Sequence, residues 1–102
     1  MPVSMQVIYP ATEGSTFDHD YYLSTHMKIV GETMGPHVET TIVTKGVAGG
    51  PGVAPGFHAI ATMTFKDQAT MDEALKASGA AVKDIPNFYN AQPQMLFGEV
   101  VA

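Results

Sequence analysis

Residues 37–65 have the sequence HVETTIVTKGVAGGPGVAPGFHAIATMTF, and this stretch decides the fold. Residues 37–47 are rich in valine, isoleucine and threonine, the β-branched residues that favour strands. Residues 57–65 place an apolar side chain at every second position, which is the period of a strand. The intervening AGGPGVAPG at 48–56 contains too much glycine and proline for a helix or a strand. We therefore expect two consecutive strands joined by a long loop.

A strand and a helix are expected before this pair. Residues 3–9 have the two-residue period of a strand, which should end at Pro10. The next segment predicts a helix that Ser15 or Thr16 caps and that the glycine–proline pair at 35–36 ends. Its mostly apolar stripe at helical spacing consists of Tyr22, Leu23, His26, Met27, Ile29, Val30 and Met34.

A second helix and a closing strand are expected after the pair. Asp67 is a suitable N-cap for the helix, and Ser-Gly at 78–79 should interrupt it. Its predicted buried stripe is Met71, Leu75 and Val82. A turn at 85–88 and a strand at 94–101 complete the order β-α-β-β-α-β. This order predicts an α+β, ferredoxin-like fold, in which a four-stranded antiparallel sheet carries both helices on one face.

Composition favours one domain that pairs with a second copy of itself. The 102 residues form a single domain, 1–102, and 45% of them are apolar while only 15% are charged. The charged share of soluble domains averages about 25%, so more of this surface is apolar. The sheet face without helices must meet water, a ligand or a partner, and several strands carry apolar side chains on both faces. We therefore expect a homodimer.

Charge and composition argue against several classes of function. The net charge is −5, and every basic residue is lysine, so neither nucleic acid nor an anionic membrane is an expected partner. Cysteine is absent, which excludes disulfides and thiolate chemistry. No signal peptide is visible in residues 1–10, and no stretch approaches the roughly 20 apolar residues of a membrane span. A cytoplasmic location is the expectation.

Two motifs resemble the EthD family, which is named for an accessory protein of alkyl-ether degradation. FDHDYYLSTH at 17–26 resembles the family's helix signature, and GAAVKDIPNFYNAQPQM at 79–95 resembles its C-terminal stretch. Val-Ile-Tyr-Pro at 7–10 fits its first strand. The chain departs from the family pattern at 27–29, where Met-Lys-Ile replaces the usual proline and aliphatic residue.

The resemblance implies a dimeric α+β barrel, in which two ferredoxin-like sheets form one barrel with a cavity in each subunit. Relatives of that architecture include cofactor-free cyclases and isomerases, small monooxygenases and haem-handling proteins. The family is associated with oxidative degradation by cytochrome P450 systems. The resemblance thus implies a fold more directly than a reaction. The expected setting is an oxidative degradation pathway, such as ether degradation, or a secondary-metabolite pathway, and an enzyme of this kind would be a cofactor-free oxidoreductase, isomerase or cyclase.

His26 is the first candidate catalytic residue, with Tyr22 as its partner. The two residues are four positions apart on one helix, so their side chains can touch. An imidazole beside a phenol could transfer a proton or hold a carbonyl oxygen. The alternative is a core histidine whose nitrogens bond to the backbone or to tyrosine hydroxyls.

His58 is the second candidate, because it shares a strand face with Ile60 and Thr62. It lines the cavity if that face points into the barrel, and otherwise it is a packing or surface residue. His19 and His37 read as exposed residues, and no histidine spacing suits a metal. We expect no metal and no cofactor.

The sequence leaves three functions open. The first is an enzyme or enzyme accessory that acts on a small hydrophobic organic compound through His26, Tyr22 and His58. The second is a non-catalytic binding module that carries such a compound for a partner oxidase. Haem binding through a helix histidine is the weakest of the three. Tyr9, at the end of the first strand, is expected at the mouth of the barrel. The methionines are expected to be mainly core residues, and the alternative is a flexible lining that adapts to a ligand.

Overall fold

The computed structural model describes residues 2–102 and confirms the predicted order of elements. The strands are β1 (Val3–Pro10), β2 (Thr40–Lys45), β3 (Phe57–Phe65) and β4 (Gln94–Glu99). The helical elements are α1 (His19–Tyr21), the π-helical turn η1 (Tyr22–His26), α2 (Met27–Thr33), α3 (Gln68–Lys76) and α4 (Gly79–Asp84). Single 3-10 turns follow α2 at Gly35–His37 and α4 at Ile85–Asn87.

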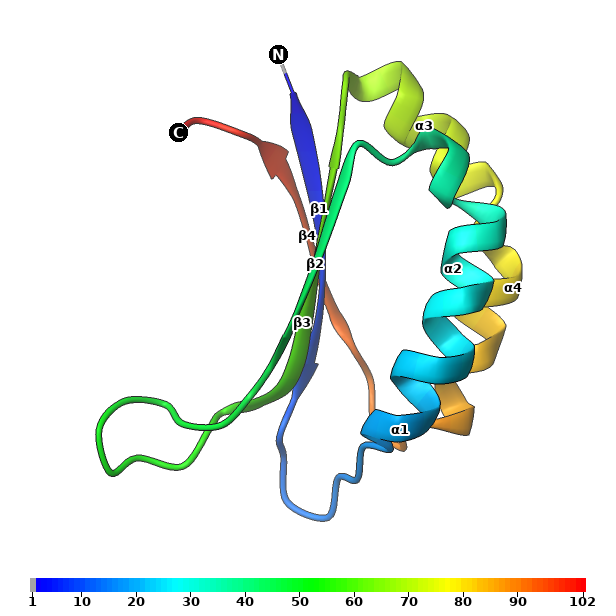
Figure 1. Ribbon diagram of the computed structural model, residues 1–102. Coiled ribbons are helices and arrows are strands. Elements are labelled where there is room, and N and C mark those ends of the chain that lie inside the picture. Colours follow the sequence, from blue (N-terminus) through cyan, green and yellow to red (C-terminus); the bar gives the residue numbers. More distant parts are fainter. Residues whose placement is uncertain (1) are drawn as a thin grey trace.

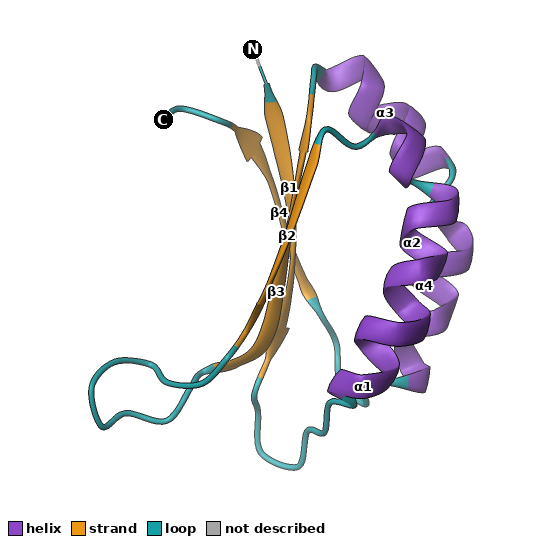
Figure 2. Cartoon of the chain, in the orientation of Figure 1, coloured by secondary structure: helices purple, strands orange, loops and turns teal. Residues whose placement is uncertain are grey.

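The four strands form one antiparallel sheet in the order β2-β3-β1-β4. All helices lie on the same side of this sheet, and the other side is bare (Figure 1). The two-layer arrangement is clear in Figure 2, where the strands form one wall and the helices the other. The α+β, ferredoxin-like fold expected from the sequence is therefore confirmed.

Aspartate side chains cap the N-termini of two helices and set where these helices begin. Asp67 caps α3 as expected, since its carboxylate accepts the Thr70 backbone N–H at 2.8 Å. The first helix begins later than expected: Asp18, not Ser15 or Thr16, is its N-cap. The Ser15 hydroxyl is used elsewhere, because it donates to the Thr12 carbonyl oxygen.

Several predicted boundaries and buried positions were wrong. The second strand spans 40–45 rather than 37–47, because the residues before it form a 3-10 turn. The last strand ends at 99 rather than 101. Leu23 is 58% exposed, since Tyr22 and His26 occupy the buried side of η1. Val82 is also 58% exposed, because α4 starts anew after residue 78 and turns Ala81 inward.

In the part of the chain that the structure describes, the bare face of the sheet carries no charged side chain. Directly paired residues share a face, and the residues on this face are Ser4, Gln6, Ile8, Thr40, Ile42, Thr44, Ile60, Thr62, Thr64, Gln94, Leu96 and Gly98. Ile42 and Leu96 are 64% and 56% exposed on it.

Among the described residues, no helix is long and apolar enough to cross a membrane.

The helix-covered face holds two packed clusters, which divide the interior. One is built mainly from aliphatic and methionine side chains around Met5, Met63 and Phe65. The other is aromatic and contains Tyr9, Tyr22, Ala59, Phe88 and Tyr89. The candidate site lies where the two clusters meet.

Candidate functional site

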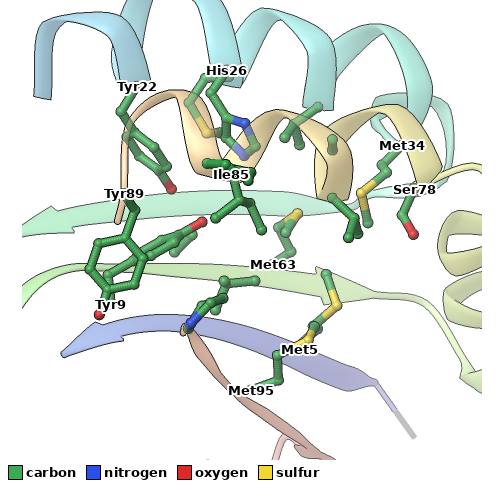
Figure 3. Close-up of a pocket in the computed structure, with 18 of the residues that line it drawn as sticks. Met5, Tyr9, Tyr22, His26, Met34, Met63, Ser78, Ile85, Tyr89 and Met95 are labelled. Atoms are coloured by element: carbon green, nitrogen blue, oxygen red, sulfur yellow. The ribbon is translucent and has the colours of Figure 1, made fainter. Parts of the chain in front are cut away.

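A cavity of about 370 Å³ lies between the sheet and the helices (Figure 3). Its walls come from β1, β3 and β4 on one side and from the helical layer on the other. Its mouth lies beside the edge strand β4, where the lining residues Met95 and Val82 are 49% and 58% exposed. The size is within the range of small-molecule pockets.

The wall of this cavity is apolar apart from a few uncharged polar groups. Its lining residues are Met5, Val7, Tyr9, Tyr22, His26, Met27, Val30, Met34, Ala61, Met63, Leu75, Ser78, Ala81, Val82, Ile85, Pro86, Tyr89, Ala91, Gln92, Pro93 and Met95. None of these is Asp, Glu, Lys or Arg. Figure 3 shows His26, Tyr22, Tyr9 and Tyr89 together at one end, while Met34, Met63 and Met5 lie toward the other.

The His26 ring is fixed by a buried carboxylate. His26 is 4% exposed, and its Nδ1 lies 3.0 Å from Oδ2 of Asp84, which is itself 7% exposed. An ionised carboxylate only accepts hydrogen bonds, so His26 Nδ1 must carry the proton that it donates to Asp84. This contact leaves Nε2 as the nitrogen that can act on a ligand.

Two further donors hold Asp84 in place. Its Oδ1 accepts the Tyr21 hydroxyl at 2.6 Å and the Asn87 amide at 2.9 Å. Burial alone would raise the pKa of Asp84, but the hydrogen bonds from Tyr21, Asn87 and His26 together hold the pKa below its ordinary value. Asp84 is therefore an ionised acceptor at neutral pH.

The His26 imidazole is neutral at the same pH. Burial lowers the pKa of His26, and the bond to Asp84 opposes that shift only in part. His26 Nε2 makes no hydrogen bond within residues 2–102, and no fully buried polar side-chain atom there lacks a partner. Nε2 therefore reaches open space, which the cavity provides, and presents a lone pair to it.

Tyr22 stacks on His26, as its position four residues earlier predicted. The two rings have centroids 5.3 Å apart and an interplanar angle of 19°. Burial raises the pKa of Tyr22 to about 12, and the hydroxyl is therefore neutral and able to donate. The Tyr9 ring packs edge-to-face against Tyr22 with a centroid distance of 5.6 Å, and burial raises the pKa of Tyr9 as well.

A π-helical turn brings these groups together. Within η1 the Met27 backbone N–H bonds to the Tyr22 carbonyl oxygen, a spacing of five residues rather than four. Such turns are rare and frequently lie at functional sites. Here its two ends are Tyr22 and His26, and both residues line the cavity.

His58 lies outside the cavity wall. The β1–β3 register shifts between Tyr9 and Pro10, opposite His58, and the His58 ring stacks on Phe17 with a centroid distance of 5.7 Å. Its Nε2 lies 2.8 Å from the Ser15 hydroxyl. The structure thus brings His26 and Tyr22 together but leaves His58 beside the first loop. Its predicted catalytic role stays a prediction.

The remaining histidines do not assemble a metal site. The His19 ring packs on Phe17 with a centroid distance of 4.6 Å, and His37 ends the 3-10 turn after α2. Among residues 2–102, no group of three or more His, Cys, Asp or Glu side chains is placed to hold a metal.

Asp84 is the residue of the candidate site that the sequence did not predict. It lies 58 residues after His26, and only the packing of α4 against α2 brings them together. One signal could have identified it, because Asp84 and Asn87 both lie in the C-terminal motif at 79–95. Acidic residues are almost never fully buried unless they are paired, so an acidic residue in a mostly apolar motif is a candidate for a buried pair.

Comparison with known proteins identifies similar chains. A family model described as "EthD domain" matches residues 12–92. An EthD-like protein from Ralstonia eutropha is 33% identical, with a TM-score of 0.87 over 99% of this chain and 93% of its own. An ethyl tert-butyl ether (EthD) family protein from Bacillus halodurans is 21% identical, with a TM-score of 0.78 over 99% and 100%.

More distant structures share the fold. An antibiotic biosynthesis monooxygenase is 14% identical, with a TM-score of 0.60 over 100% of both chains. No curated protein matches the sequence.

Proposed function

Because the chain belongs to the EthD family, we propose that it binds a small hydrophobic organic compound in the cavity and transforms it by proton transfer. The single observation that carries this proposal is His26, a neutral imidazole held by Asp84 with Nε2 open to an apolar cavity. A carboxylate that fixes the tautomer of a histidine makes its second nitrogen an effective general base.

Tyr22 supplies the complementary group. As the base removes a proton, negative charge develops on the compound, and the neutral Tyr22 hydroxyl can donate a hydrogen bond to that charge or polarise a carbonyl. The reaction needs no charged side chain in the cavity wall. We place it in an oxidative degradation or secondary-metabolite pathway, with ether degradation among the options.

We also propose that the active form is a homodimer. The uncharged bare face of the sheet, with Ile42 and Leu96 exposed, is suited to contact with a second copy about a two-fold axis. Light scattering coupled to size-exclusion chromatography should then give twice the 10.8 kDa chain mass. A stable single chain at working concentration would contradict the dimer.

Binding and proton transfer can be tested separately. N-phenyl-1-naphthylamine, a neutral fluorescent probe, should bind the wild-type protein. Met95→Trp, at the mouth of the cavity, should weaken that binding several-fold. Leu23→Trp adds the same ring at an exposed helix position and should not. Equal probe affinity in all three proteins would show that the cavity is not the binding site.

The role of His26 needs a reaction. His26→Gln keeps a polar side chain of similar length, and His37→Gln is the matched control outside the cavity. Loss of turnover in the first variant alone is the expected result. Unchanged turnover in folded His26→Gln would leave a non-catalytic carrier as the function.

A further inference from the structure

We infer, on the basis of the proposed function, that the compound is an uncharged ketone with a hydrogen on the carbon next to the carbonyl group. Three features of the cavity suit such a compound. Its wall carries no charge, its polar end has one hydrogen-bond donor beside one acceptor, and the rest of its wall is apolar.

The cavity selects against charged ligands. Its wall contains no Asp, Glu, Lys or Arg, so a carboxylate or phosphate would lose its hydration without gaining an ion pair. Asp84 does not compensate for this, because it lies behind His26 and its two oxygens already accept three hydrogen bonds. An ammonium group would therefore also lack a free carboxylate.

The polar end offers one free donor next to one free acceptor. Tyr22 lines this end of the cavity, with its ring edge-to-face against that of Tyr9, and its neutral hydroxyl can donate to a ligand. His26 Nε2, on the ring stacked against Tyr22, is the acceptor. A carbonyl oxygen can accept from Tyr22 while the hydrogen on the neighbouring carbon points to His26 Nε2.

The proton transfer that follows is balanced within these groups. His26 Nε2 takes the proton from carbon, the C–H electron pair forms a carbon–carbon double bond, and the carbonyl π pair moves to oxygen. Tyr22 donates its hydrogen bond to the resulting enolate oxygen. The imidazolium, stabilised by ionised Asp84, returns a proton to carbon or to oxygen, so no oxidant or reductant is needed.

The rest of the cavity accommodates an apolar body of variable shape. Beyond the polar end the wall includes Met5, Met34, Met63, Val30 and Leu75, which come from β1, β3 and the helices. Unbranched thioether side chains adjust to ligands of different outline. The ketone should therefore be the recognised feature, with a ring system or alkyl chain filling the remaining space.

Deuterium exchange tests this without knowledge of the natural compound. The probe is 2-tetralone, a neutral bicyclic ketone, in buffered D₂O, with incorporation at its two α carbons followed by NMR. The wild-type protein should exceed His26→Gln by about 100-fold or more, which is typical of a positioned base. Tyr22→Phe should bind the probe but exchange it at least about 10-fold more slowly. His37→Gln should match the wild type.

Three further ligands distinguish a failure of the ketone inference from a failure of the proposed function. Tetralin lacks the carbonyl, 2-tetralol replaces it with a hydroxyl, and tetralin-2-carboxylate carries a charge. If tetralin, 2-tetralol or the carboxylate binds as tightly as 2-tetralone, or if exchange stays at the buffer rate, the ketone inference is overturned while binding in the cavity stands. If none of the four ligands binds at millimolar concentration, the proposed function itself fails.

Discussion

Asp84→Asn should move the proton of the neutral His26 ring from Nδ1 to Nε2, while residue 84 keeps the shape of its side chain. Oδ1 of Asp84 accepts from two donors, Tyr21 and Asn87, so the new amide keeps its oxygen there. Its NH₂ group then faces His26 Nδ1, 3.0 Å from the replaced oxygen. An amide N–H donates, so Nδ1 must become the acceptor and the proton moves to Nε2.

The loss of stability in Asp84→Asn can be worked out from the three hydrogen bonds that Asp84 accepts. Hydrogen bonds to a charged group contribute about 1.5–3 kcal/mol and neutral ones about 0.5–1.5 kcal/mol. Neutralising Asp84 weakens all three bonds but also removes a buried charge, so the net loss should be about 2 kcal/mol. For a domain of about 100 residues this lowers Tm by roughly 10 °C. The variant should therefore remain folded at room temperature.

The loss in activity should be far larger than the loss in stability. With a proton on Nε2, the cavity receives a donor where it had a base, and α-proton exchange of 2-tetralone should fall by about 10²–10⁴-fold. Tyr21→Phe is the matched control. It removes the 2.6 Å bond to Asp84 and costs similar stability, but it leaves the carboxylate on His26 and should retain most of the exchange rate.

Nitrogen NMR of the histidine rings reads the tautomer directly. In the wild type, the His26 signals should show a protonated Nδ1 and a bare Nε2, and in Asp84→Asn the reverse. A folded Asp84→Asn protein that keeps its proton on Nδ1, or that exchanges 2-tetralone at the wild-type rate, would refute the role given to Asp84.

Packing and titration give three more predictions. Gly46→Ala should destabilise the protein by about 2 kcal/mol in urea unfolding, because the added Cβ would overlap the carbonyl oxygen of Phe57, the first residue of β3. Gly31→Ala, where α2 leaves open space for a Cβ, should stabilise the protein by about 0.5–1 kcal/mol. If Gly31→Ala proved the more destabilising of the two, the close approach of Gly46 to β3 would be contradicted. Asp67→Ala should cost about 1 kcal/mol through loss of the α3 cap, seen as a lower Tm. Burial lowers the pKa of His26, so its contribution to the free energy of unfolding should be complete above about pH 6.5 and decline as pH falls through the lower folded value. A pH slope unchanged in His26→Gln would show that another group is responsible.

Local patterns account for most of the fold. The two-residue period of β3 placed Ala59, Ala61 and Met63 on the buried face, and the cap at Asp67 set the start of α3. Both signals depend only on neighbouring residues: successive strand side chains alternate between faces, and a cap bonds within its own first turn. The resemblance of two motifs to one family added the expectation of a cavity.

Half of the site could also be predicted from sequence. Tyr22 and His26 are four positions apart, so a helix was enough to bring them together. Sequence spacing could not show that a π-helical turn joins them, since its register depends on packing against the rest of the molecule. The same limit explains Leu23, which a regular helix would have buried.

The order of elements, the low charge and a histidine–tyrosine pair on one helix could all be read from the chain before it folds. Which nitrogen of His26 is free could not, because Asp84 is 58 positions away and reaches Nδ1 through the packing of two helices. The isolation of His58 also depends on the folded chain, because a shift in the strand register places its ring against Phe17. Contacts between distant segments follow from the packing of whole elements, which local periodicity does not encode.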